Sequence, residues 1–311
     1  MRKLFIHGGL FVATLASMTY AFGFGDEQLP LAERLVTGLF FSVPAILILG
    51  AHEMGHYLMA RAHGVDSSWP YFIPLPLGFG TLGAVIQLKG KIPSRNALFD
   101  IGVAGPLAGL AIAVPMLLVG VMYSHPVHSP LPPFPPTYSL LHQASELGMA
   151  IRHFIDGVEA PAGAQVQGTY FGDNLLSLLA TRVVWGKLPA GMDLDAHPVF
   201  VAAWFGMLVT TLNLMPAGQL DGGHVMRSFF GPKAEQLGHH VASALIILAA
   251  VASASWLLWF FIISRVVGFG HPPPTDDLTP LSRGRRLTAY ATWLITVLVF
   301  IPVPMDVLTV S

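Results

Sequence analysis

The chain has 311 residues, of which 53% are hydrophobic and only 11% are charged, and its formal net charge is −1. Soluble domains carry about a quarter charged residues, so this composition excludes an ordinary soluble protein and indicates a membrane protein. The nearly neutral charge gives no reason to expect a nucleic acid partner, and the lack of cysteine excludes disulfides and thiolate metal ligands.

Six apolar stretches approach the roughly 20 residues that a helix needs to cross a bilayer. They predict an all-α polytopic membrane protein with about six transmembrane helices, at residues 4–23, 35–62, 99–123, 198–215, 241–263 and 287–303. The first stretch follows the basic start "MRK", as the core of a signal peptide would. Its apolar run is long for a signal peptide and no clear small-residue cleavage site follows, so we expect a span.

These stretches divide the chain into five parts. The parts are a first helix and loop (1–34), a core with two helices (35–123), an extramembrane Pro-rich helical insertion (124–197), a core helix (198–240) and C-terminal helices (241–311). If the amino terminus is cytoplasmic, the basic residues near the first three spans share one side of the membrane. Six spans would put the arginines of residues 264–286 on the other side, so the sequence leaves the side of that loop open.

Residues 69–95, "WPYFIPLPLGFGTLGAVIQLKGKIPSR", are apolar but too rich in Pro and Gly for a helix. Residues 81–89 have β-branched side chains between glycines, which predicts a short strand. Apolar, non-helical backbone must be buried in protein or line a watery cavity. We therefore predict a re-entrant β hairpin beside the polar motif of residues 51–60; a partly buried loop at the membrane surface is the alternative.

The insertion opens with "SHPVHSPLPPFPPTYS", a polyproline-like spacer. Residues 139–155 and 173–188 then predict two helices, of which the second is capped by Asp173. The two helices can lie at the membrane interface or form a small subdomain packed on the spans.

Polar residues interrupt the second apolar stretch in "AHEMGHYLMA", residues 51–60. On a helix, His52 and His56 lie one turn apart on the same face, so their imidazoles can hold one metal ion. Glu53 flanks that position and can deprotonate a water activated by the metal. Unpaired ionisable groups are costly inside a bilayer, which favours a functional site over incidental polar residues.

A catalytic zinc ion usually has three protein ligands, so another span should supply the third. Asp221, in "TLNLMPAGQLDGGHVM", is the best candidate. Pro216 and Gly218 break the apolar helix before it. Gly222 and Gly223 free the backbone after it, which lets the carboxylate turn towards another helix. A loop residue at the membrane surface is the alternative for Asp221.

Two further features lie close to these motifs. Gly102, Gly105 and Gly109 recur at helical spacing in the third span, which predicts close packing against the helices that carry the candidate ligands. His224, three residues after Asp221, is expected at the surface or behind the ligands rather than on the metal.

The two motifs together resemble the site-2 family of intramembrane metalloproteases, whose signatures are H-E-x-x-H on one span and N-x-x-P-x-x-x-L-D-G on another. The second signature is matched by Asn213, Pro216, Leu220, Asp221 and Gly222. The resemblance covers at least residues 35–240 and extends to the Gly-Pro pair in "VAGPLAGL". It implies one zinc ion held by His52, His56 and Asp221, with Glu53 as general base. It also implies that Asn213 steadies the substrate or the developing oxyanion.

The resemblance implies an intramembrane zinc endopeptidase that cuts transmembrane helical protein substrates in the lipid bilayer, as in regulated intramembrane proteolysis. It implies a multi-pass protein of a bacterial inner membrane or a plastid-type membrane. Many members carry a PDZ domain between the motif-bearing spans, but residues 124–197 are Pro-rich there and have no recognisable carboxylate-binding loop. The chain is therefore closest to PDZ-less members, and the oligomeric state is open.

The main alternative function is a membrane transporter for metal ions or protons that uses buried His, Asp and Glu. A transport pathway needs ligands but no base beside the first histidine, so Glu53 favours the peptidase. A catalytically inactive relative is disfavoured by the complete set of ligands and base. Prenyl-protein proteases also use H-E-x-x-H but take a Glu as third ligand, and the three downstream candidates, Glu146, Glu159 and Glu235, all lie outside the predicted spans.

Overall fold

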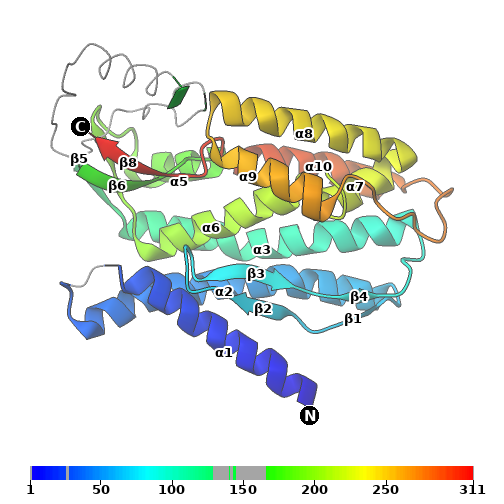
Figure 1. Ribbon diagram of the computed structural model, residues 1–311, viewed down its shortest axis with the longest axis horizontal. Coiled ribbons are helices and arrows are strands. Elements are labelled where there is room, and N and C mark those ends of the chain that lie inside the picture. Colours follow the sequence, from blue (N-terminus) through cyan, green and yellow to red (C-terminus); the bar gives the residue numbers. More distant parts are fainter. Residues whose placement is uncertain (1, 26–27, 129–139, 141–142, 145–165, 311) are drawn as a thin grey trace.

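The computed structural model describes residues 2–25, 28–128, 140, 143–144 and 166–310 (Figure 1). It is mostly helical, and in this part of the chain four helices are long and apolar enough to cross a membrane: Phe5–Gly23, Leu31–Ala62, Arg95–Tyr123 and Asp221–Val251. The helical elements are α1 (Arg2–Gly23), α2 (Leu31–Ala62), α3 (Arg95–Tyr123), α5 (Leu175–Trp185), α6 (Pro198–Asn213), α7 (Asp221–Phe230), η1 (Gly231–Lys233), α8 (Ala234–Val251), α9 (Ser255–Ile262), η2 (Ile263–Val267) and α10 (Arg283–Val299).

The strands are short and form four two-stranded sheets within the described residues, so the fold is less purely helical than predicted. They are β1 (Asp66–Ser67), β2 (Tyr71–Pro74), β3 (Thr81–Val85), β4 (Leu88–Lys89), β5 (His125–His128), β6 (Val166–Phe171), β7 (Met192–Asp195) and β8 (Met305–Val310).

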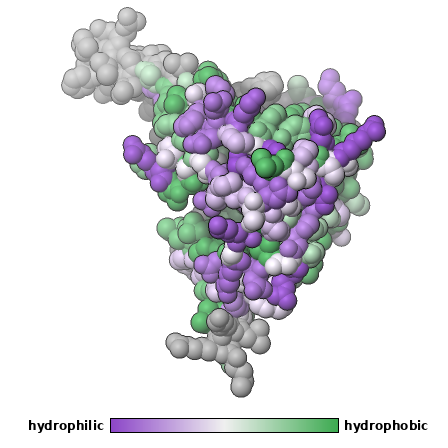
Figure 2. Space-filling model, turned by 90° about the vertical axis from the view of Figure 1, so that its right-hand side faces the viewer, coloured by the Kyte–Doolittle hydropathy of each residue, from purple (hydrophilic) through white to green (hydrophobic). Residues whose placement is uncertain are grey.

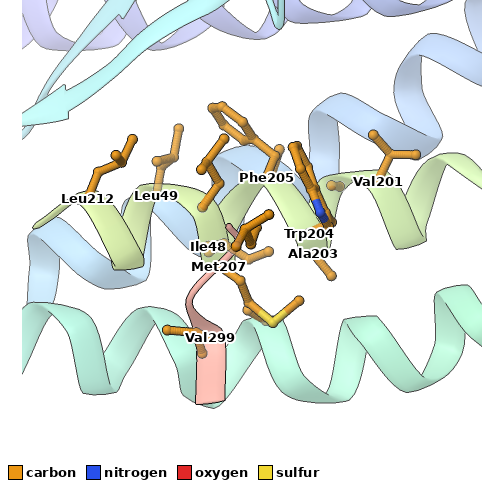
Figure 3. Close-up of a cluster of buried hydrophobic side chains, with 14 of the residues drawn as sticks. Ile48, Leu49, Val201, Ala203, Trp204, Phe205, Met207, Leu212 and Val299 are labelled. Atoms are coloured by element: carbon orange, nitrogen blue, oxygen red, sulfur yellow. The ribbon is translucent and has the colours of Figure 1, made fainter. Parts of the chain in front are cut away.

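The core is built where α2, α3 and α6 lie side by side (Figure 1). Figure 3 shows Ile48 and Leu49 of α2 meeting side chains of α6, among them Trp204, with Val299 at the end of α10 beside them. Helix α6 is apolar on nearly all of its sides and buries 13 of its 16 residues. A helix without a polar face belongs inside a larger assembly of helices or in lipid.

The outward face of α2 is apolar as well. Its exposed residues include Leu35, Leu39, Phe40, Val43 and Leu47, which are 41–50% exposed. A contiguous apolar face of this kind is not kept in water, so it supports a membrane environment for this helix.

Two of the predicted spans become shorter helices. Residues 198–215 form α6, which has 16 residues, and residues 287–303 fall on α10, which has 17 residues and ends at Val299. Both helices are shorter than the roughly 20 residues of a full span.

The prediction of one span at residues 241–263 is wrong. The helix stops at Val251, and α9 begins at Ser255 and runs back along α8 (Figure 1). The buried Ser253 lies in the reversal, where its hydroxyl oxygen accepts a hydrogen bond from the Ser255 N–H at 3.3 Å. A serine side chain that bonds nearby backbone competes with helix continuation.

This reversal also answers the question of the basic loop. Because α9 returns towards the start of α8, the loop after it lies at the end of the molecule where α3 begins. Arg285 of α10 donates hydrogen bonds to both carboxylate oxygens of Asp100 in α3, at 2.7 and 2.6 Å. Figure 2 faces this end and shows hydrophilic side chains gathered across it, with hydrophobic ones at its sides. The basic loop and the basic residues just before and at the start of α3 therefore share one end of the protein.

An antiparallel β hairpin lies within residues 69–95. Strand β2 pairs antiparallel with β3, with Tyr71 opposite Val85 and Phe72 opposite Ala84. The predicted strand at 81–89 is interrupted at residues 86–87 between β3 and β4. The hairpin packs against α1 and α2 on the lower side of Figure 1.

The described part of residues 124–197 contains more strand than its sequence pattern predicted. Strand β5 pairs with β7, and β6 pairs with the C-terminal β8. The predicted helix at 173–188 is confirmed as α5, but its cap is Asn174, whose side chain accepts from the Ser177 N–H at 2.8 Å, rather than Asp173. The predicted helix at 139–155 falls almost wholly outside the described residues.

Candidate metal centre

Helix α2 supplies three polar residues of the site from one buried turn. His52, Glu53 and His56 are 4–7% exposed in a helix whose other buried residues are nearly all apolar. The helical rise brings His52 and His56 together as predicted, with their Nε2 atoms 3.1 Å apart. Two imidazole nitrogens at this distance need a proton or a cation between them, because two lone pairs would repel.

Asp221 comes from the other half of the chain and meets both rings. Its Oδ2 lies 3.2 Å from Nε2 of His52 and 3.3 Å from Nε2 of His56. Asp221 is the first residue of α7, just after α6 has ended and the chain has turned. The predicted meeting of the three side chains is therefore present in the structure.

The glycines around Asp221 allow this turn. Gly218 has φ of +50°, a left-handed conformation that glycine adopts without strain. A Cβ on Gly222 would strike the carbonyl oxygen of Leu214, and one on Gly223 would strike that of Gly218. The motif "PAGQLDGG" thus folds back on itself tightly enough to bring the start of α7 against the end of α6.

Helix α3 forms the wall behind the two histidines. A Cβ on Gly105 would overlap the His56 ring, and one on Gly109 would lie 3.3 Å from Cβ of His52. Gly102 of the same face lies against His224 of α7, where an added Cβ would come within 2.7 Å of the His224 Cβ. The prediction that these glycines let the third span approach the ligand-bearing helices is confirmed.

The same helix orients His56. Its Nδ1 lies 2.7 Å from the carbonyl oxygen of Ile101. A carbonyl only accepts, so Nδ1 donates, and Nε2 is the ring nitrogen that faces Asp221. Such a partner fixes the tautomer and the orientation of a metal-binding histidine.

Two more residues of the sequence motifs lie at the same site. The Glu53 carboxylate faces the backbone of Ile86, in the break between β3 and β4. Nδ2 of Asn213, the last residue of α6, lies 3.3 Å from Nε2 of His52. The hairpin and α6 therefore both end at the metal centre.

The donor set fits zinc. His52, His56 and Asp221 each offer one ligand atom, and these atoms lie within 4.8 Å of one another. Among the described residues, these three form a group of His and Asp side chains that could hold a metal ion. Two imidazole nitrogens and one carboxylate oxygen are zinc ligands, and three of them leave a coordination position open, as in catalytic zinc sites.

The sequence predicted His224 at the surface or behind the ligands, and it gave His271 no role at the site. His224 lies behind Asp221, and its Nδ1 is 3.0 Å from the Leu220 carbonyl oxygen and 3.4 Å from Nε2 of His271. Burial, followed by the charge of His224, lowers the pKa of His271 to about 4. His271 follows α9 by several residues, and no spacing in the sequence relates it to His224.

A polar cavity of about 180 Å³ lies on the "PAGQLDGG" side of the site. Its lining includes Gly218 and Gly223, together with Arg227, Glu235 and His271. None of the three ligand candidates belongs to its lining.

A membrane protein with H-E-x-x-H on one helix and a converging aspartate on another falls in the class of membrane metallopeptidases. The family model of peptidase family M50 matches residues 40–257, and the chain belongs to this family. This confirms the resemblance to the site-2 proteases. The residues that form the centre, from His52 to Asp221, all lie within the matched region.

Several curated relatives carry the name of zinc metalloproteases. The chain is 29% identical over 290 residues to "Probable zinc metalloprotease EGY1, chloroplastic" of Arabidopsis thaliana, which covers 92% of this chain and 45% of that protein. It is 30% identical over 254 residues to the EGY1 protein of Oryza sativa subsp. japonica, and the match covers 81% of this chain and 38% of that protein. It is 27% identical over 248 residues to EGY2 of Arabidopsis thaliana, and the match covers 79% of this chain and 38% of that protein.

The chain spans less than half the length of these relatives. No solved structure matches it.

Proposed function

We propose that the protein is an intramembrane zinc endopeptidase that hydrolyses peptide bonds within or near transmembrane helices of membrane proteins. The observation that carries this proposal is the meeting of His52, His56 and Asp221 around one position, with the Glu53 carboxylate buried beside them. Membership of the M50 family and the zinc metalloprotease names of its relatives support it.

In this proposal His52, His56 and Asp221 hold one zinc ion. Bound zinc lowers the pKa of a water molecule towards neutrality and polarises the scissile carbonyl. Glu53 takes the proton of the attacking water and delivers it to the leaving amine. Asn213 donates a hydrogen bond to the oxyanion as it forms.

The substrate we propose is an extended stretch of a transmembrane helix that has unwound locally. A helix uses its own peptide groups for hydrogen bonds, so an unwound stretch needs new partners in the membrane. Among the described residues β3 pairs with β2 alone, which leaves its second edge for β-augmentation by such a stretch. Its outward residues Leu82 and Val85 are 68% and 48% exposed, which suits an apolar partner.

We further propose that the hairpin is re-entrant and that α6 and α10 cross the bilayer, which gives about six spans in a multi-pass protein. The location we propose is a bacterial inner membrane or a plastid-type membrane, and the relatives named as chloroplastic favour the plastid type. Water reaches the centre from the end that carries the polar cavity and the basic residues.

The direct test is the variant Glu53→Gln, reconstituted with a membrane protein that wild type cleaves. We expect it to retain zinc and to lose cleavage by about 10²- to 10⁴-fold, because general acid–base catalysis contributes this much. Glu33→Gln is the matched control, since Glu33 is an exposed acid in the first turn of the same helix. Undiminished cleavage by Glu53→Gln would reject the base, and metal flux through liposomes without any peptidase activity would favour a transporter instead.

A further inference from the structure

The loop between η2 and α10, residues 268–282, crosses from the end of the α8–α9 hairpin to the start of α3; we name it the strap. It lies beyond the residues 40–257 that the M50 family model matches. It contains "HPPPTDD", in which consecutive prolines favour an extended, stiff backbone. The strap nevertheless contacts α7, which carries Asp221, and α3, which forms the wall behind the two histidines.

The backbone of the strap is fixed to the segment that leads into α3. The N–H of Thr275 donates to the Ile92 carbonyl oxygen at 2.9 Å, and the N–H of Asp276 donates to that of Pro93 at 2.9 Å. Farther along, the N–H of Ser282 donates to the Asn96 side-chain oxygen at 3.3 Å. These bonds hold the middle of the strap in a set position relative to α3.

At that position the strap presents Asp277 to two arginines. Its carboxylate makes an ion pair with Arg227 of α7, and its other oxygen lies 3.7 Å from Nε of Arg95, the first residue of α3. The side chains of Arg227 and Arg95 are only 8% and 12% exposed, and that of Asp277 is 24% exposed. We name these three residues the clamp.

The clamp joins the two helices at matching distances from the metal centre. Arg227 follows Asp221 by six residues in α7, and Arg95 precedes Ile101, whose carbonyl orients His56, by six residues in α3. Six residues are about 9 Å of helix. A shift of α7 against α3 at the clamp would therefore move Asp221 relative to the His56 ring.

The position of α7 depends on tertiary packing. Its 10 residues lead through the 3₁₀ turn Gly231–Lys233 into α8, and this change of helix type separates α7 from the longer helix, so α7 takes little of its position from its own stability. Without Asp277, two largely buried guanidinium groups would face each other with no counter-charge between them. Removal of one partner from a buried ion pair is strongly destabilising for this reason.

We propose that Asp277 is a positioning residue, which ties α7 to α3 through Arg227 and Arg95 and so keeps Asp221 in register with His52 and His56. This inference rests on the proposed zinc centre, but it concerns a part of the chain outside the matched family region. The strap thereby acts on metal binding without touching a metal ligand.

The test compares Asp277→Asn with Asp276→Asn in the full chain. The two changes remove the same charge from adjacent residues, but Asp276 makes no ion pair among the described residues, and its carboxylate instead accepts from the N–H groups of Leu278 and Thr279 at 3.1 Å. Asn retains an acceptor oxygen for that turn. Zinc affinity is measured by competition with a chelator, and Tm is measured with zinc and after chelation.

We expect zinc to bind Asp277→Asn about tenfold or more weakly than wild type, in the range seen when groups that support metal ligands are lost. The rise of Tm on adding zinc should shrink in this variant, which a loss of general stability alone would not cause. Asp276→Asn should behave as wild type. Equal zinc affinity in wild type and Asp277→Asn would overturn the proposal, and so would equal losses in the two variants.

If Asp277→Asn does not fold, Arg227→Lys decides the question, because lysine keeps the charge but lacks the forked donors of arginine. We expect it to weaken zinc binding measurably, and unchanged affinity would overturn the clamp. If wild type itself binds no zinc, the metal centre fails together with the clamp. If wild type binds zinc and the variants match it, only the clamp fails.

Discussion

The metal centre and the clamp are both clusters of three side chains that join α7 to an earlier helix, yet their chemistry is opposite. In the metal centre two imidazole nitrogens and one carboxylate oxygen, all of them atom types that bind zinc, lie within 4.8 Å of one another. In the clamp two guanidinium groups surround one carboxylate, so the cluster contains its own cations. The first cluster therefore offers a set of metal ligands, whereas the second pairs a carboxylate with cations of the protein itself. This difference is the physical reason to assign metal chemistry to one and a structural role to the other.

Among the substitutions that test this difference between the two clusters, the largest loss of activity is expected at Asn213, which lies beside the metal centre but is not one of its three ligand candidates. Asn213→Ala should lower the rate of substrate cleavage by about 10²-fold, the cost of losing one donor to an oxyanion. Its zinc content should stay that of wild type. Loss of zinc from the purified variant would show instead that Asn213 helps to hold the metal.

A smaller effect is expected at the glycine wall behind the histidines. Gly105→Ala should weaken zinc binding by about 10- to 100-fold, since its Cβ would displace the His56 ring and support of the ligands is lost. Gly109→Ala is the matched control, because its Cβ would lie at 3.3 Å from the His52 side chain, where a slight adjustment suffices. Chelator competition compares the two variants, and equal affinities would contradict the role of α3 as a fitted wall.

The metal centre could be predicted from the sequence because its geometry follows from local rules. The spacing of His52 and His56 dictates that they share a helix face, and the Pro and Gly residues before Asp221 dictate that its helix is broken. Paired motifs of the family then indicate that the two segments meet. The carbonyl of Ile101, which orients His56, could not be predicted because every residue carries such a group.

The C-terminal part of the chain was predicted less well for a physical reason. Hydropathy counts apolar residues, so residues 241–263 appeared as one span, although a buried serine at 253 permits a reversal within them. The count of six spans, which includes this stretch, is the reason why the sequence left the side of the following loop open. The clamp depends on long-range contacts of the strap, and no periodicity in the sequence relates Asp277 to Arg227 or Arg95.

The measurement that tests the account most directly is the zinc content of purified protein, with wild type, Glu53→Gln and Asp221→Ala compared after identical dialysis. We predict about one zinc ion per chain in wild type and in Glu53→Gln, and almost none in Asp221→Ala, because a catalytic zinc ion needs its third protein ligand. Full zinc content in a folded Asp221→Ala protein would contradict the assignment of this aspartate and with it the metal centre described above.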